Sequence, residues 1–162
     1  MKRYFYIVAV LVVILMLPSA ISPQRQGIKP GNIAPKVVVG DTLIYNATTN
    51  GTGYTLLHFW ASYDAPSRIA NIQYNEVMEL LDSDAIQYIA VSYEHSETLF
   101  SEIVKRDNVT TTSQYYDEAG RASKTYGRYR LHKGFATYLI DATGKIVAEN
   151  PSPQDLTQLF GQ

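Results

Sequence analysis

The order of strand and helix signals predicts an α/β domain with a central mixed β-sheet, flanking helices and an N-terminal β-hairpin. Two apolar runs, residues 54–60 and 85–92, alternate with helical segments, and this βαβ order requires parallel pairing. Two later runs flank the turn Ala142-Thr143-Gly144, which is typical of an antiparallel hairpin. One sheet that contains both kinds of pairing is mixed.

Each predicted element has a local reason in the sequence. Val37–Val39 and Thr42–Tyr45 are β-rich runs on either side of a Gly-Asp pair, which predicts the N-terminal hairpin. Residues 54–60 form an apolar run interrupted only by His58, as expected of a strand buried on both faces. The remaining predictions are helices at 64 to about 82–84, 97–106 (capped by Ser96), 122–129 and 153–160, and strands or β-rich segments at 85–92, 110–116, 135–141 and 145–149.

The first long helix is predicted from its start signals. Asp64 is a good N-cap residue because its carboxylate can accept a free backbone amide, and Pro66 suits the first turn. Apolar residues then recur at helical spacing and predict a broad buried arc. The members of that arc are Ile69, Ile72, Val77, Leu80 and Leu81.

Composition excludes several classes of function. The 162 residues suit one domain, and 46% hydrophobic with 18% charged residues is typical of a globular chain. Fourteen basic and fifteen acidic residues provide no positive field for nucleic acid. The chain contains no cysteine, which excludes disulfides, thiolate nucleophiles and thiol redox cycles.

The N-terminus predicts export. Lys2 and Arg3 precede fourteen apolar residues, 4–17, and Pro18-Ser19-Ala20 follows. Residues 1–20 are therefore interpreted as a signal peptide or an N-terminal membrane anchor, and an uncleaved segment 4–21 would anchor the chain to the inner membrane. Residues 21–30 are interpreted as a linker, and residues 31–162 as the folded domain. The expected location is the periplasm or cell envelope.

Three strings of the sequence are similar to those of one known family. Gly31-Asn-Ile-Ala-Pro35 is similar to the family's opening string. Residues 58–68, HFWASYDAPSR, are similar to its Phe-Trp-Ala-Ser-Trp-Cys-x-Pro-Cys-Arg string. Tyr138-Leu-Ile-Asp141 followed by Gly144-Lys-Ile146 is similar to its late hairpin. The chain thus resembles the thioredoxin superfamily, specifically exported thiol-disulfide reductases of the TlpA/ResA type, which are related to AhpC/TSA proteins, and the resemblance implies a thioredoxin-like fold.

The departures from the family pattern concern the redox site itself. By the resemblance, Asp64 and Ser67 stand where the family has its attacking and resolving cysteines, so neither position can exchange disulfides. Ala136 stands where the family has a cis-proline. A cis bond before a residue other than proline costs about 3–4 kcal/mol, so we expect a trans Phe135–Ala136 bond and a reshaped loop.

His58 lies close to Asp64 and Ser67 in the sequence, and the three residue types together could indicate a catalytic site. His58, Ser67 and Asp64 could in principle form a nucleophile, base and orienting acid, yet a buried neutral histidine and a capping aspartate explain the same residues without chemistry. The resemblance also implies that Tyr63, Tyr126 and Tyr129 cluster near the former redox face, where they would suit a binding surface. Scattered amphipathic positions on strands and helices explain these tyrosines more simply. The spacing of the histidines predicts no metal site.

The leading hypothesis is a redox-inactive, exported thioredoxin-fold protein that acts as a peptide-binding, protein-binding or accessory module of the cell envelope. No catalytic residue, cofactor or metal is predicted, and contact with a membrane is expected only through the N-terminal segment. The predicted binding residues are Trp60, Tyr63, Asp64, Ser67, Phe135 and Ala136. One alternative is a non-redox enzyme, such as a hydrolase, that uses Asp64, Ser67 and His58. A second is a thioredoxin-family protein that counts as an oxidoreductase by homology only, and a third is a membrane-tethered structural subunit.

Overall fold

The structure is a computed structural model that describes residues 25–48, 53–81 and 85–161. The predicted signal peptide or anchor, residues 1–20 or 4–21, lies outside these residues, so its role stays a prediction. Within the described part of the chain, no helix is long and apolar enough to cross a membrane.

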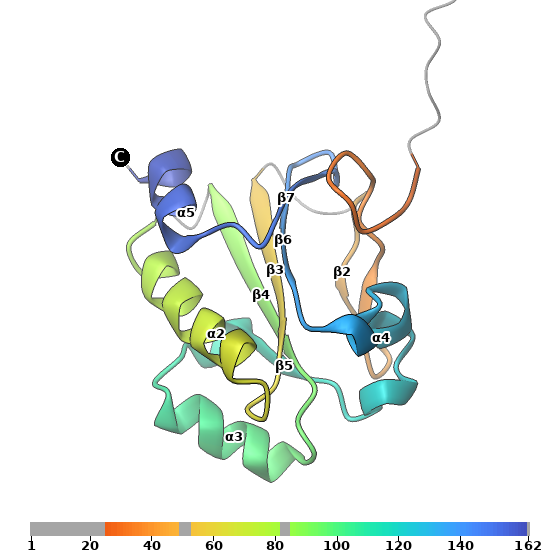
Figure 1. The fold of residues 1–162 in the computed structure, drawn as a ribbon, viewed down its shortest axis with the longest axis vertical. Helices are drawn as coiled ribbons and strands as arrows, with labels where there is room; N and C mark the ends of the chain where they lie inside the picture. Colours follow the sequence, from red (N-terminus) through yellow and green to blue (C-terminus); the bar gives the residue numbers. More distant parts are fainter. Residues whose placement is uncertain (1–24, 49–52, 82–84, 162) are drawn as a thin grey trace, which may run out of the picture.

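A five-stranded mixed sheet forms the centre of the domain and confirms the predicted fold class (Figure 1). Its strands lie in the order β5-β4-β3-β6-β7. β3, β4 and β5 are parallel, whereas β6 is antiparallel to β3 and β7 is antiparallel to β6. The strand bounds are β3 Tyr54–Trp60, β4 Ile86–Ser92, β5 Gln114–Tyr116, β6 Thr137–Ile140 and β7 Ile146–Glu149.

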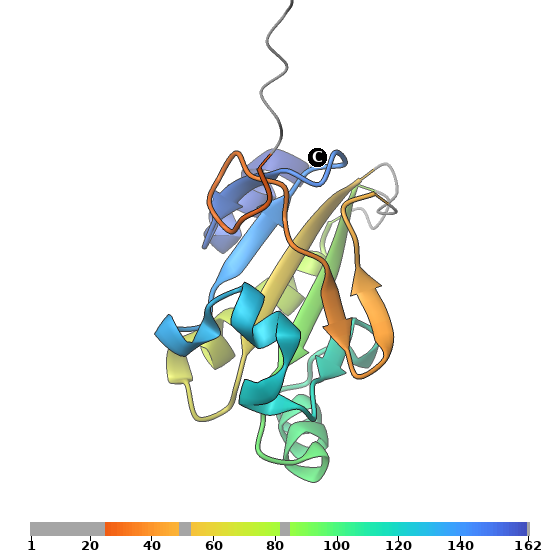
Figure 2. The same ribbon diagram turned by 90° about the vertical axis from the view of Figure 1, so that its right-hand side faces the viewer.

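Helices and a small hairpin cover the two faces of this sheet (Figures 1 and 2). One face carries α2, α3 and α5, and the other carries the hairpin β1–β2 and α4. The bounds are β1 Val37–Val39, β2 Thr42–Tyr45, α2 Ala65–Met78, α3 Glu97–Arg106, α4 Lys124–Arg128 and α5 Pro153–Phe160. Three short 3₁₀ turns occupy Thr111–Ser113, Gly120–Ala122 and Leu131–Lys133.

Two segments are less regular than the sequence predicts. Only Gln114–Tyr116 of the β-rich segment 110–116 pairs as a strand, because the chain before it turns as a 3₁₀ helix. The helical stretch 122–129 is divided between the end of one 3₁₀ turn and α4, which Ser123 caps.

The chain enters the domain before Gly31. Gln26 bridges to Ile33, and the Gly27 amide donates to the Ile33 carbonyl at 3.0 Å. The Gly31 amide reaches the Ile146 carbonyl of β7 at 2.8 Å. Residues 25–30, which the sequence assigns to the linker, are thus hydrogen-bonded to the fold.

Helix α2 differs from its prediction in two ways. It ends at Met78 rather than near residues 82–84. The expected apolar arc is confirmed in part: Ile72, Val77 and Leu81 pack against the core of this face, whereas Ile69 is 54% exposed and Leu80 is 84% exposed. The most deeply buried residues of α2, which we call its polar stripe, are Ser67, Asn71, Tyr74 and Asn75, whose polar groups form hydrogen bonds with the sheet and the loops.

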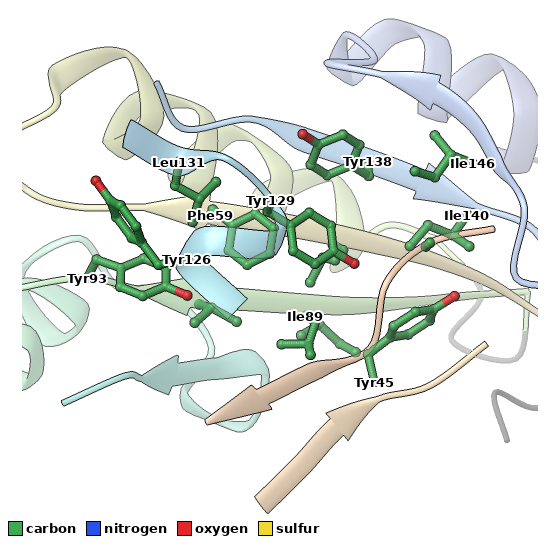
Figure 3. Close-up of a cluster of buried hydrophobic side chains, with 14 residues drawn as sticks. Tyr45, Phe59, Ile89, Tyr93, Tyr126, Tyr129, Leu131, Tyr138, Ile140 and Ile146 are labelled. Atoms are coloured by element: carbon green, nitrogen blue, oxygen red, sulfur yellow. The ribbon is translucent and has the colours of Figure 1, made fainter. Parts of the chain in front are cut away.

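Each face of the sheet has its own core. The α2 face contains Leu56, Trp60, Tyr88 and Leu139, which pack against α2, α3 and α5. The hairpin face is rich in aromatic residues: Phe59 lies 4.6 Å from Tyr129 and 6.4 Å from Tyr138, measured between ring centroids (Figure 3). Alternate residues of β3 point to opposite faces, so His58 points toward α2 while Phe59 points toward the hairpin.

Candidate functional site

Asp64 begins α2 in the way its sequence predicts. Its backbone is extended, and its Oδ1 accepts the Ser67 amide at 3.0 Å. Pro66 occupies the first turn, where its missing amide proton costs nothing. The carboxylate therefore satisfies one of the free amides at this helix end, an interaction worth about 0.5–2 kcal/mol.

The Ser67 hydroxyl holds the loop before α2. It donates to the Asp64 carbonyl at 3.0 Å and accepts the Ala61 amide at 3.3 Å. The same loop is also fixed from the segment that follows β4, because the buried Glu94 carboxylate accepts the Ser62 amide. Ser67 stands where the family has its resolving cysteine, and its hydroxyl stabilises the local fold.

His58 forms the floor of the site and is fully buried. Its Nε2 lies 2.9 Å from the Ser67 carbonyl oxygen, and its Nδ1 lies 2.8 Å from the Thr137 hydroxyl. A carbonyl only accepts, so Nε2 carries the proton and Nδ1 accepts from Thr137. Burial lowers the pKa of His58 to about 4, against the opposing effects of the Ser67 carbonyl and the Asp64 charge.

This orientation decides what the imidazole can do. A general base must lie within hydrogen-bond reach of the proton it removes. Nε2 points to the Ser67 carbonyl, and the Ser67 hydroxyl is bonded to the backbone of Asp64 and Ala61. His58 is not placed to activate Ser67, and the hypothetical set of Ser67, His58 and Asp64 is not assembled.

The loop 134–136 lies opposite the start of α2. The Phe135–Ala136 peptide bond is trans, and the Ala136 carbonyl accepts the Phe59 amide at 3.2 Å. Among the described residues, the amide and carbonyl of Phe135 and the amide of Ala136 have no hydrogen-bond partner. Ala136 thus adds a free donor that a proline at this position would lack.

These segments enclose a groove of about 340 Å³, which we call the α2 groove. Its walls are the first turns of α2 and the loop 134–136, and its floor contains His58 and Tyr74. The lining residues are His58, Asp64, Pro66, Ser67, Ala70, Tyr74, Gly134, Phe135, Ala136, Thr137 and Asn150. The volume lies within the range of ordinary binding pockets.

An aromatic group borders this groove. The Tyr63 side chain is 51% exposed, stacks on His95 at 5.0 Å and lies 6.3 Å from the Phe135 ring, measured between centroids. Pro66 and Ile69 are exposed on the adjacent surface of α2. The groove therefore opens onto a surface with several apolar side chains.

The structure brings four of the six predicted binding residues into one site. Asp64, Ser67, Phe135 and Ala136 line the groove, and Tyr63 borders it. Trp60 does not: its side chain is 0% exposed and its Nε1 donates to Gln114 at 3.1 Å.

The other two tyrosines of the expected cluster lie elsewhere. Tyr126 and Tyr129 are buried in the hairpin-side core (Figure 3). Tyr63 is exposed, although Tyr126 lies close enough to help raise its pKa. Packing in this core accounts for both side chains.

Sequence reasoning missed Tyr74 and Asn150 as groove residues. Tyr74 belongs to the polar stripe of α2, which an apolar pattern cannot reveal. Asn150 follows β7, accepts the Thr137 amide at 2.8 Å and donates its own amide to the Thr137 carbonyl at 2.7 Å. No local motif links it to Asp64, because the sheet topology alone brings them together.

Comparison with known proteins places these features in a family. No family model and no curated protein sequence matches the chain. A solved thioredoxin-like protein from Parabacteroides distasonis is 36% identical over 83% of this chain and 96% of that chain, with a TM-score of 0.74. A thiol-disulfide oxidoreductase from Bacteroides fragilis is 26% identical over 67% of this chain and 79% of that chain, with a TM-score of 0.56.

A third solved structure supports the fold alone. A thiol:disulfide interchange protein from a Bacteroides species is 17% identical over 82% of this chain and 88% of that chain, with a TM-score of 0.67. Thiol-disulfide exchange needs a thiolate, and this chain has none. The chain belongs to the thioredoxin-like family of thiol-disulfide oxidoreductase relatives, and it is a member without redox cysteines.

Proposed function

We propose that this protein is a redox-inactive, exported thioredoxin-like module that binds an extended segment of a partner protein in the α2 groove. The observation that carries the proposal is the groove itself, which remains open between Asp64 and the loop 134–136 although the cysteines are absent. Export rests on the N-terminal sequence, with two basic residues before an apolar stretch.

The loop 134–136 offers the backbone groups that an extended chain needs. An added strand gains affinity from main-chain hydrogen bonds and specificity from pockets for alternate side chains. Two free amides and one free carbonyl at Phe135 and Ala136 supply the first requirement, and the groove beside them supplies the second.

The groove surface suits contact rather than proton transfer. His58 is buried and has a lowered pKa, so it is neutral near pH 7 and Asp64 is the one charged side chain that lines the groove. Tyr63, which borders the groove, offers a large contact area at small entropic cost, as aromatic residues do in many interfaces.

The test uses an unfolded polypeptide without thiols. We would titrate carboxamidomethylated α-lactalbumin into the ¹⁵N-labelled protein purified after export, and follow the backbone amide shifts. Binding should shift the amides of Ser67, Phe135 and Ala136 most strongly. Tyr63→Glu should weaken binding several-fold, because it places a charge at the apolar border of the groove.

A matched variant controls for nonspecific hydrophobic contact. Leu159 on α5 is 64% exposed and does not line the groove, so Leu159→Glu should leave the affinity unchanged. Shifts confined to α5, equal effects of the two variants, or no binding would each contradict the proposal.

A further inference from the structure

A second hollow lies on the other side of the loop 134–136. It has a volume of about 310 Å³ and shares Gly134, Phe135, Ala136 and Asn150 with the α2 groove. We call it the basic hollow. Its remaining lining residues are Ile28, Tyr129, Arg130, Lys133, Tyr138 and Glu149.

The two cavities carry opposite charge. Asp64 is the ionised residue of the α2 groove, whereas Arg130, Lys133 and Glu149 leave the basic hollow with a net positive charge. Within the described part of the chain, the side chains of Arg130 and Lys133 form no ion pair or hydrogen bond. Both cations are exposed and available to an anion from outside.

The backbone that positions these cations is unusual. Arg130 adopts a left-handed conformation, with φ 55° and ψ 37°, immediately before the 3₁₀ turn Leu131–Lys133. This conformation is unfavourable for a residue other than glycine, asparagine or aspartate. The Arg130 carbonyl accepts the Lys133 amide at 3.0 Å. This hydrogen bond closes the turn that places the Arg130 and Lys133 side chains at the basic hollow. Strain retained in this way is common at binding sites.

We propose that the basic hollow binds a carboxylate of the same polypeptide whose extended segment occupies the α2 groove. This inference rests on the proposed function and specifies its ligand as a segment with an acidic group on the far side of the loop 134–136 from Asp64. The carboxylate belongs either to an Asp or Glu side chain or to the C-terminus of the partner. Arg130 and Lys133 would bind it as charge-assisted donors.

The test compares four fluorescent eight-residue peptides with one shared central sequence of Val, Thr and Tyr. The first has a Glu side chain and an amidated C-terminus, and the second has a free C-terminal carboxylate and no acidic side chain. The third is neutral and amidated, and the fourth carries Lys in place of Glu. Anisotropy should show one of the first two binding about threefold to tenfold more tightly than the neutral peptide, and the Lys peptide binding more weakly.

Variants assign the preference to the hollow. Lys133→Glu should abolish the preference for the acidic peptide, and Arg130→Asn should reduce it while keeping a residue that tolerates the left-handed backbone. Lys105→Glu on α3, which does not line the hollow, is the matched control and should preserve the preference. Raising the salt concentration should reduce the advantage of the acidic peptide.

The outcomes separate this inference from the proposed function. If the unfolded polypeptide binds but the four peptides bind equally or not at all, the carboxylate site is refuted and the groove proposal stands. Failure of the polypeptide and of all four peptides to bind refutes both. A preference that survives Lys133→Glu and Arg130→Asn together would also overturn the assignment to this hollow.

Discussion

The two faces of the central sheet bury polar groups in different ways. On the α2 face, the Asn71 Oδ1 accepts the Tyr88 hydroxyl at 2.7 Å and the Gln114 Nε2 at 3.1 Å, while the Gln114 Oε1 accepts the Trp60 Nε1. Tyr74 donates to the Pro151 carbonyl at 2.7 Å. These four side chains from α2, β3, β4 and β5 thus satisfy one another, whereas the buried Ser92 hydroxyl of the same face has no partner among the described residues.

On the hairpin face, one buried tyrosine hydroxyl has a hydrogen-bond partner and another has none among the described residues. Tyr129 donates to the Pro35 carbonyl at 2.5 Å, yet the buried Tyr45 hydroxyl has no partner among the described residues (Figure 3). Tyr45 and Tyr88 are both buried, but only the Tyr88 hydroxyl has a hydrogen-bond partner among the described residues. The difference shows that burial alone does not tell how much a polar group contributes to stability; its partners do.

The largest expected effect comes from breaking the network on the α2 face. Asn71→Leu removes the acceptor of both the Tyr88 hydroxyl and the Gln114 Nε2 and leaves two buried donors without a partner. Each such donor costs about 1–3 kcal/mol, so the free energy of unfolding should fall by about 2–6 kcal/mol. Urea unfolding at pH 7 measures this change.

Gln73→Leu is the control, because Gln73 is exposed on the same helix. It should change the free energy of unfolding by less than about 0.5 kcal/mol. A loss below about 1 kcal/mol for Asn71→Leu would mean that the α2 face is no more dependent on its polar groups than the hairpin face.

A pH titration sharpens the comparison on the same face. Burial lowers the pKa of His58 to about 4 from an ordinary value of 6.5, so the folded state binds fewer protons than the unfolded state between these values. Stability should therefore fall as the pH drops from 6.5 to 4, by roughly 3 kcal/mol in total. Urea midpoints at half-unit intervals measure the slope.

His58→Gln should flatten this profile, and His132→Gln at an exposed position should leave it unchanged. The Ser152 amide holds the pKa of Asp155 below its ordinary 3.8, so the stabilising contribution of this carboxylate is lost only below the window. Parallel profiles for wild type and His58→Gln would show that another group governs acid stability.

Sequence patterns predicted most of the fold because apolar periodicity and caps act locally. The structure confirms β3 at Tyr54–Trp60, α3 at Glu97–Arg106 and α5 at Pro153–Phe160 with the predicted bounds. The Asp64 cap was likewise visible, because its partner Ser67 lies three residues away.

The polar stripe of α2 was not predictable in this way. Asn71 can be buried because its side chain forms hydrogen bonds with Gln114, which lies 43 positions further along the chain. The residues next to Asn71 in the sequence resemble an exposed helix face. Local pattern therefore predicts Ile69 on the buried face, whereas the structure exposes it. In the groove, Asp64 and Ser67 came from one motif, whereas Asn150 depends on the pairing of β6 with β7.

The smallest effect should come from the hairpin face. Tyr45→Phe removes a buried hydroxyl that has no partner among the described residues and keeps the ring in its aromatic core. At pH 7 the free energy of unfolding should change by less than about 0.5 kcal/mol, because no hydrogen bond is lost. A loss comparable to that of Asn71→Leu would contradict the contrast between the two faces.

Alkaline pH gives the same variant a second readout. Burial, with the Asp141 charge adding to it, raises the pKa of Tyr45 to about 12. The unfolded phenol ionises near pH 10, so the folded state holds its proton longer and wild-type stability falls as the pH rises from 10 to 12. Phenylalanine has no proton to lose, and Tyr45→Phe should lose about 1 kcal/mol less than wild type between pH 7 and pH 11. Identical alkaline profiles would mean that the Tyr45 hydroxyl is hydrogen-bonded or solvated in the folded protein. The buried tyrosines of the two faces would then not differ in this respect.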